Sequence, residues 1–228
     1  MQKKNNSKAI RALISSEKDI LNYLRKVVKT HSFNYRTFGV AVEPYISEVL
    51  IKNFKKAGLI KTKKDYFLAP NKNYFPDFEL KTSLLLAIEY KSGNRVKKSK
   101  ERWAECKNSN NDMGTLNVWS DKIKKFGGKN IYYVFAIYKF DDQAKKILDV
   151  EIAPFYKFIG LNSAGLLRYR EKDGNLRPKD FYQKAPVKSL KEFNQLLKET
   201  IIYRSKRIIK KHQAILKSCG VNVKLSWD

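Results

Sequence analysis

The sequence has few acidic residues, few cysteines and histidines, and no long apolar run. Its 228 residues include 22 Asp and Glu against 48 Lys and Arg, which gives a formal net charge of +26 at pH 7. An excess of this size disfavours a compact chain through self-repulsion, so it points to a polyanionic partner. Because 43% of the residues are hydrophobic and 13% are aromatic, the chain can bury a core. The charge therefore belongs to a folded protein and not to a disordered tail.

Several protein classes are excluded by what is missing. No apolar run approaches the ~20 residues that a membrane helix needs, so no membrane partner is expected. The basic N-terminus is followed by no signal-peptide core, and Cys106 and Cys219 are too few for a disulfide framework, so a cytoplasmic location is expected. His31 and His212 stand alone without a CxxC, which excludes a zinc finger. Because GxxxxGK(S/T) and GxGxxG are both absent, no nucleotide cofactor is expected.

Hydrophobic periodicity predicts a single α/β domain over 1–228. A capping box of Ser16 and Asp19 is expected to begin the first helix, after a flexible basic tail over 1–8. Residues 94–112 are expected to be solvated and partly helical. The other expected elements are a helix over 17–30, a helix over 40–56, a short strand in 61–74, two strands within 75–93, a helix over 118–126, strands over 131–140 and 147–152, and a helix over 190–216.

The order of these elements predicts a central mixed β-sheet flanked by helices. An irregular C-terminal extension follows the sheet and ends in the long basic helix over 190–216. No internal repeat of solenoid length is present. The expected architecture is thus a compact sheet domain with one extension.

Three charged residues stand out in the hairpin predicted within 75–93. Asp77 is followed, after eleven intervening residues, by Glu89-Tyr90-Lys91. The spacing alone is weak evidence, because (D/E)xK occurs three times in this basic chain. Context separates the three, since only Glu89–Lys91 closes an apolar strand that has a Pro-Asp upstream.

The geometry of a hairpin places these charges together. If the connection is the three residues 81–83, Leu80 faces Leu84 and Asp77 lies opposite Ala87, on the same face as Glu89 and Lys91. A connection of two residues would move Asp77 to the other face. Two adjacent carboxylates repel unless a cation intervenes, and oxygen ligands suit Mg²⁺. A neighbouring lysine can orient or deprotonate a water, which completes the equipment for metal-assisted phosphodiester hydrolysis.

The segment PDFELKTSLLLAIEYK, residues 76–91, resembles the PD-(D/E)xK nuclease superfamily, best known from type II restriction endonucleases. The resemblance implies that Asp77 and Glu89 bind Mg²⁺ together with the backbone carbonyl of Tyr90. It implies that Lys91 is the catalytic lysine that serves the water nucleophile. Mn²⁺ is expected to substitute for Mg²⁺, and Ca²⁺ is expected to bind without supporting cleavage.

The superfamily often adds an acid from the helix before the hairpin. The segment FGVAVEPYISEVL offers Glu43 and Glu48 for this position. The preceding Gly39 favours Glu43, whereas Pro44 suits the start of a helix better than its middle. Both acids stay open as candidates, with a solvated helix position as the alternative for each.

Basic and amide side chains around this core are expected to contact double-stranded DNA. The catalytic core is expected over about 36–152, and the extension over 153–228 is expected to serve DNA contact and dimerisation. For the basic residues the alternative is a solvated face, and for the Asn residues it is an ordinary loop. The predicted DNA contacts are Arg95, Lys97, Lys98, Lys100, Arg102, Asn108, Asn110, Asn111, Arg204, Arg207, Lys210 and Lys211.

These features together predict a Mg²⁺-dependent endonuclease of the type II restriction class. A homodimer would match a palindromic DNA site by shared two-fold symmetry. Two other functions stay open. One is a DNA-repair nuclease or Holliday-junction resolvase with the same core, and the other is a nucleic-acid-binding protein without catalytic activity.

Overall fold

The computed structural model describes residues 2–34, 37–71, 74–81, 85–97, 103–105, 112–140, 145–180 and 183–221, with the backbone only for 2–6, 95–97 and 103–105. In these ranges the helices are α1 (Gln2–Thr30), α2 (Phe38–Ala41), α3 (Glu43–Lys56), α4 (Trp119–Phe126) and α5 (Leu190–Ser218). The strands are β1 (Tyr66–Leu68), β2 (Phe78–Lys81), β3 (Leu85–Lys97), β4 (Trp103–Glu105), β5 (Ile131–Phe140) and β6 (Lys145–Pro154).

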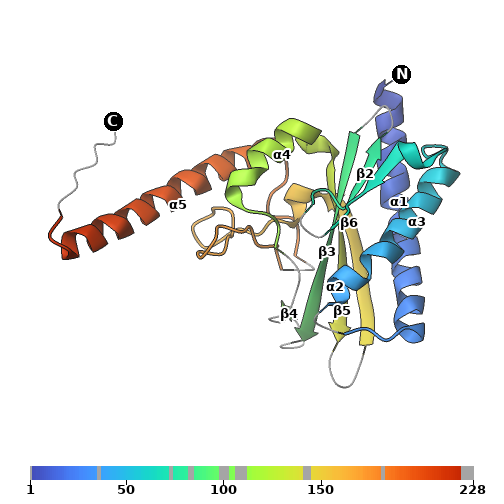
Figure 1. Ribbon diagram of the computed structural model, residues 1–228, viewed down its shortest axis with the longest axis horizontal. Helices are drawn as coiled ribbons and strands as arrows, with labels where there is room; N and C mark the ends of the chain where they lie inside the picture. Colours follow the sequence, from blue (N-terminus) through green and yellow to red (C-terminus); the bar gives the residue numbers. More distant parts are fainter. Residues whose placement is uncertain are drawn as a thin grey trace.

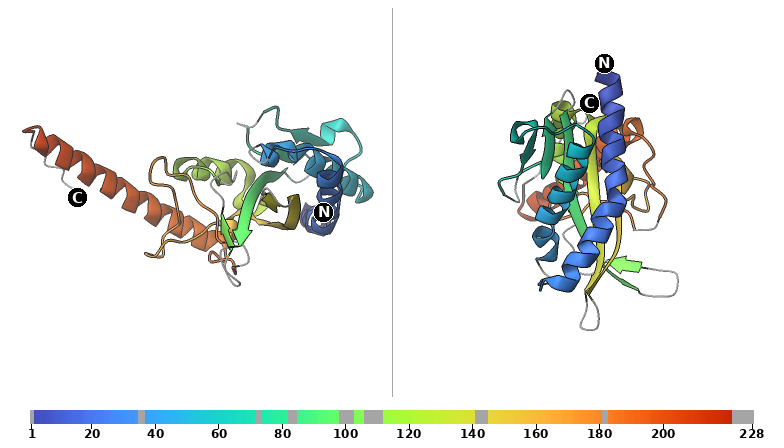
Figure 2. Two further views of the ribbon diagram at one scale, coloured as in Figure 1. Left: turned by 90° about the horizontal axis from the view of Figure 1, so that it is seen from below. Right: turned by 90° about the vertical axis from the view of Figure 1, so that its right-hand side faces the viewer.

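The strands form one mixed sheet in the order β1-β2-β3-β5-β6, and β4 pairs with β3 off this path. The central pair β3–β5 is parallel, and the other neighbouring pairs are antiparallel. Helices α1 and α3 cover one face, and α4 and the start of α5 lie on the other (Figures 1 and 2). The predicted α/β class, with a mixed sheet between helices, is therefore confirmed.

The central strands are apolar because both faces of the sheet are covered. On one side, Leu86, Ile88 and Tyr90 of β3 join the core beneath α1 and α3. On the other side, Ala87 joins the core of aromatic and aliphatic side chains around Trp119. The alternation along β3 thus assigns its odd-numbered side chains, including positions 89 and 91, to the face that carries α4.

Helix α1 begins at Gln2, so the predicted start at Glu17 is wrong. Its buried stripe of Leu13, Ile20 and Leu24 runs through Ser16, which is itself fully buried. The Ser16 hydroxyl donates to the Ala12 carbonyl (2.8 Å) and accepts from the Asn53 side chain (3.0 Å). A serine in this setting is a satisfied core residue and not a cap, because both of its bonds lie within the helix layer.

The helix that precedes the hairpin is divided in two. Val42 separates α2 from α3, and Pro44 stands in the first turn of α3. A proline fits there because the first backbone N–H groups of a helix have no intrahelical acceptor. Glu43 is consequently the first residue of α3 and lies at its N-terminal end.

Strand β3 continues through Lys97, and its far end pairs with β4. The expectation of partly helical structure over 94–112 is therefore wrong for 94–97 and 103–105. The strand over 131–140 matches β5, and β6 extends beyond the predicted 147–152 at both ends. A short 3-10 helix (Phe155–Phe158) follows β6, and residues 159–180 contain turns and isolated bridges, as expected for the extension. Helix α5 projects away from the body (Figure 1).

Candidate active site

Asp77 is fixed to the hairpin by the backbone of the opposite strand. The Tyr90 N–H donates to the Asp77 Oδ2 over 2.5 Å. Lys81 pairs with Leu85 and Phe78 with Ile88, so the register continues to place Asp77 opposite Glu89. The predicted partner, Ala87, is thus wrong by two residues. Because a shift of two preserves the face, Asp77 still shares its face with Glu89 and Lys91.

Glu89 and Lys91 form an ion pair on β3. The Lys91 Nζ lies 2.8 Å from the Glu89 Oε1, with side-chain exposures of 13% and 11%. The neighbouring strand β5 holds this segment, since Glu89 pairs with Tyr133 and Lys91 with Phe135. Burial alone would lower the pKa of Lys91, but the carboxylates of Glu89 and Asp77 raise it above its usual value. Lys91 is therefore an ammonium at neutral pH.

Tyr90 points away from this cluster and anchors the strand from behind. Its hydroxyl lies 3.0 Å from the Ser47 hydroxyl of α3, and both residues are buried. The side chain cannot reach the carboxylates on the other face of the strand. Only the backbone of Tyr90 is available on the side of Asp77, which agrees with a role for its carbonyl and not for its phenol.

The carboxyl groups of the cluster are hard to ionise together. Burial, assisted by the nearby Glu89 charge, raises the pKa of Asp77 to about 8. Burial and the Glu89 charge also raise the pKa of Glu43 to about 7, against the opposing effect of Lys91. Carboxylates that repel one another in this way are stabilised by a bound cation. The cluster thus has the electrostatics of a cation site.

The oxygen donors fit a hard divalent cation. Glu89 Oε2 is buried and has no hydrogen-bond partner among the described residues. A buried carboxylate oxygen without a partner is costly, and a metal ion would satisfy it. No group of three or more Asp, Glu, His or Cys side chains in the described ranges is arranged to hold a metal. The candidate donors are instead Asp77, Glu89 and the backbone carbonyl of Tyr90, a set with two carboxylates.

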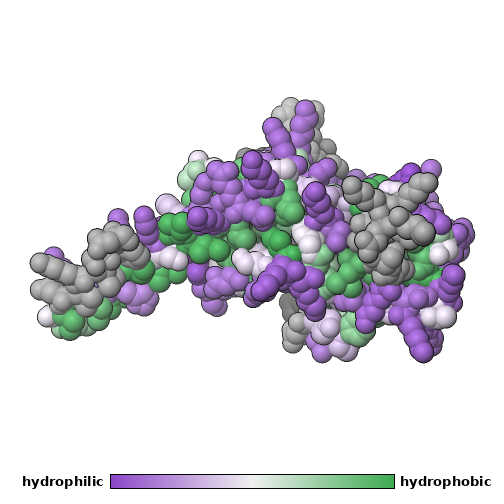
Figure 3. Space-filling view, turned by 90° about the horizontal axis from the view of Figure 1, so that it is seen from above, coloured by the Kyte–Doolittle hydropathy of each residue, from purple (hydrophilic) through white to green (hydrophobic). Residues whose placement is uncertain are grey.

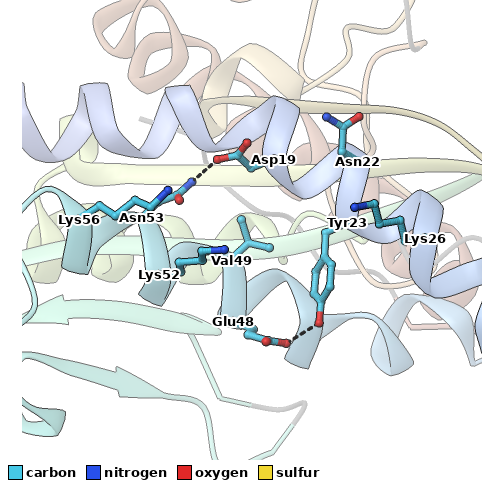
Figure 4. Close-up of a pocket in the computed structure, with 9 residues that line it drawn as sticks. All are labelled: Asp19, Asn22, Tyr23, Lys26, Glu48, Val49, Lys52, Asn53 and Lys56. Carbon is cyan, nitrogen blue, oxygen red and sulfur yellow. Dashed lines mark hydrogen bonds between the residues drawn. The ribbon is translucent and has the colours of Figure 1, made fainter.

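Of the two acids in α3, the structure brings only Glu43 to the cluster. Glu48 accepts a hydrogen bond from the Tyr23 hydroxyl (2.7 Å) in a groove between α1 and α3 (Figure 4). The groove has a volume of about 340 Å³ and lies on the helix layer behind the sheet. Its lining residues are Asp19, Asn22, Tyr23, Lys26, Glu48, Val49, Lys52, Asn53 and Lys56.

One cation near the cluster was not among the predicted residues. Lys122 of α4 interacts electrostatically with Glu89, Lys91 and Asp77, and burial lowers its pKa to about 8. Its Nζ lies 3.7 Å from the centre of the Phe75 ring. No sequence motif marks Lys122, because its position depends on how α4 packs across the sheet. Helix α4 also contains the exposed Lys124 and Lys125, and the sequence alone does not show that Lys122 is the lysine that faces inward.

The predicted DNA contacts fall into three groups. Lys98, Lys100, Arg102, Asn108, Asn110 and Asn111 lie outside the described residues. The backbone of Arg95 and Lys97 lies in the part of β3 that pairs with β4. On α5, Arg207 bonds the Glu171 carboxylate (2.5 Å) and Arg204 the Glu171 carbonyl (3.3 Å), whereas Lys210 and Lys211 are exposed.

Comparison with solved structures identifies a related fold. No protein family and no curated protein matches the chain by sequence. Among solved structures, the chain is similar to the NlaIV restriction endonuclease with a TM-score of 0.55 at 16% sequence identity, over 86% of this chain and 79% of that one. The chain has a restriction-endonuclease-like fold. At this identity the likeness concerns the backbone, so the site residues rest on their own geometry.

No helix in the described part of the chain is long and apolar enough to span a membrane. The residues that the structure brings together are Asp77, Glu89 and Lys91 of the hairpin, Glu43 and Lys122. They meet on the central sheet of a nuclease-like fold.

Proposed function

We propose that this protein is a Mg²⁺-dependent endonuclease that cuts double-stranded DNA at a specific, palindromic site, as a type II restriction enzyme does. The observation that carries the proposal is the Glu89–Lys91 pair of 2.8 Å beside Asp77, on the central sheet of this fold. Two acids and a lysine on one face of the hairpin are the minimum equipment for metal-assisted hydrolysis. The PD-(D/E)xK pattern of the sequence supports the same conclusion.

Each residue has a distinct role in the proposed reaction. Asp77, Glu89 and the Tyr90 carbonyl would hold Mg²⁺, and Glu43 would support this set from α3. When bound, Mg²⁺ would supply a Lewis acid at the phosphate oxygens. The oxygen of a water forms a bond to phosphorus and releases a proton to solvent. The bond from phosphorus to the 3′ oxygen breaks in line, and this oxygen takes a proton from solvent, which leaves 5′-phosphate and 3′-hydroxyl ends. Because Lys91 is an ammonium, it orients the water and offsets phosphate charge.

The protruding half of α5 supports a DNA-binding dimer. Its basic side chains include Lys210 and Lys211, both exposed, which can bind phosphates without sequence preference. Apolar side chains also lie along the protruding arm (Figure 3). Those that are at least one-third exposed are Ile202, Tyr203, Ile208, Ile215 and Leu216. An exposed apolar stripe of this kind is typical of a contact surface, and we assign it to a second copy of the chain.

A dimer through α5 can be tested by light scattering after size-exclusion chromatography. The wild-type protein is expected to elute with twice the chain mass, and a variant with Ile208→Glu and Ile215→Glu with the chain mass. Substitution of exposed Lys18 to Glu on α1 is the matched control and leaves the mass unchanged. A monomeric wild type would contradict the homodimer.

The enzymatic proposal is tested by incubating the protein with plasmid DNA and Mg²⁺. Discrete fragments of reproducible size are the result expected for a site-specific enzyme. A smear, or cutting confined to branched DNA, would instead favour a repair nuclease or a Holliday-junction resolvase. DNA binding without cleavage in Mg²⁺ or Mn²⁺ would favour a binding protein without catalytic activity.

A further inference from the structure

Lys122 is a lysine in an unusual setting. Its ammonium lies 3.7 Å from the centre of the Phe75 ring and 5.2 Å from that of the Trp119 indole. No carboxylate of the described residues lies within ion-pair distance of it. Both rings are themselves fixed, because Phe75 packs against Phe126 and the Trp119 N–H donates to the Met113 carbonyl (3.1 Å). The fixed rings of Phe75 and Trp119 therefore define the position of the ammonium.

The surroundings of Lys122 are those of the candidate active site. Phe75 lies two residues before Asp77, so the ring beneath the ammonium belongs to the segment that positions this acid. Electrostatic interactions connect Lys122 with Glu89, Asp77 and Lys91. The face of the sheet that carries Glu89 and Lys91 is the face on which α4 packs. The lysine thus approaches the carboxylate cluster from the helix layer above it.

Among the described residues, none supplies an anion of its own to this ammonium. Aromatic rings stabilise a cation through their quadrupoles, but they leave its N–H donors without an acceptor. Glu89 pairs with Lys91 through Oε1, Asp77 accepts from the Tyr90 N–H, and neither carboxylate lies within ion-pair distance of Lys122. A phosphate oxygen entering the site would supply the missing acceptor, and the charge of a transferring phosphoryl group strengthens such a contact.

We propose that Lys122 is a phosphate-contact residue of the active site, which binds the phosphate group that is cut and stabilises the charge that develops on it. This inference rests on the proposed nuclease function and adds a second lysine, from α4, to Lys91 of β3. The two lysines have different proposed roles. Lys91 is paired with a carboxylate and orients water, whereas Lys122 is held by rings and binds substrate.

The test compares Lys122→Met and Lys122→Arg with Lys18→Met, an exposed lysine on α1 whose loss removes the same charge. Methionine keeps an apolar side chain over Phe75, and arginine keeps the charge. Thermal melts establish that each variant is folded. Single-turnover cleavage of plasmid DNA in Mg²⁺ is expected to slow by about 10²-fold to 10³-fold in Lys122→Met. It is expected to stay within about tenfold of wild type in Lys122→Arg and to be unchanged in Lys18→Met.

A second readout separates phosphate contact from a structural role. The dissociation constant for a fluorescent duplex of about 30 base pairs is measured in Ca²⁺ at several salt concentrations. Loss of one phosphate contact lowers the slope of log Kd against log salt by about 1, which a packing role would not do. A slope and a cleavage rate that are both unchanged in Lys122→Met would overturn the inference. If wild type fails to cut but the slope falls, the nuclease proposal fails and the phosphate contact stands.

Discussion

Lys91 and Glu89 form a nearly buried ion pair, with 2.8 Å between Nζ and Oε1, on the strand that also holds Asp77 through the Tyr90 N–H. Such a pair adds little to stability when both partners are present, because desolvation offsets their attraction. Removing one partner leaves the other charge buried and unpaired. The pair thus adds little to the stability of the fold, and its use lies in the proposed catalysis.

Substitution of Lys91 by Met is expected to lower the free energy of unfolding by about 3–5 kcal/mol, because Glu89 then stays buried without its counter-charge. The double variant with Glu89→Gln is expected to regain most of this loss, since the neutral amide needs no cation. Denaturant titration measures both, with Lys18→Met as the control for loss of one charge. Cleavage is expected to be absent from the single and the double variant alike. A Lys91→Met variant as stable as wild type would contradict the buried pair.

Asp77→Asn is expected to abolish cleavage with little change in DNA affinity, because the charge that holds DNA lies on other residues. In the absence of metal, Asp77→Asn is also expected to change how the stability of the fold depends on pH. Folding raises the pKa of Asp77 to about 8. Since the unfolded group titrates near its usual value of about 4, its ionisation makes wild type less stable as pH rises between about 4 and 8. Tm measured in a chelator therefore falls less over this range in Asp77→Asn. Equal falls would contradict the raised pKa.

Metal binding is expected to compete with protons at the same carboxyl group. A ligand must be deprotonated to bind a cation, and the pKa of metal-free Asp77 is about 8. The apparent affinity for Mg²⁺ consequently rises with pH until about 8, by up to about tenfold for each pH unit. Calorimetric titration with Mg²⁺ across this range measures the slope. Asp77→Asn serves as the control and shows neither the affinity nor its pH dependence.

Glu43 and Glu48 are expected to differ in their effect on catalysis. Glu43→Gln removes a charge beside Lys91 and Glu89, so single-turnover cleavage should fall by about 10-fold to 100-fold. Glu48 lies in the groove between α1 and α3, and Glu48→Gln retains an acceptor for the Tyr23 hydroxyl. Cleavage should therefore stay at the wild-type rate. The reverse ranking of the two variants would show that the third acid comes from Glu48.

The hairpin illustrates how much of the site the sequence can predict. The alternation of side chains placed Asp77 on the face of Glu89 and Lys91, although the predicted connection was displaced by one residue and the register by two. Asp77 lies on the predicted face because side chains alternate along a strand with a period of two, so a shift of two residues preserves the face. Pro44 likewise marked the true start of α3, because proline is favoured in the first turn of a helix.

Other features depend on tertiary contacts that no local pattern carries. Ser16 resembles a helix cap in sequence, yet it is buried because Asn53 of another helix satisfies its hydroxyl. The extension of β3 past Gly93 depends on its pairing with β4 and β5. Lys122 was missed because its neighbours Phe75 and Trp119 come from different segments. Long-range packing, and not periodicity, decides these positions.

The central claim, that the Asp77, Glu89 and Lys91 cluster cuts DNA, is tested most directly by a plasmid digest with purified wild type and Lys91→Met side by side in Mg²⁺. Wild type is expected to give a reproducible ladder of discrete fragments, and the folded variant is expected to leave the plasmid intact. Identical fragments from both proteins, or intact plasmid with wild type in Mg²⁺ and in Mn²⁺, would contradict it.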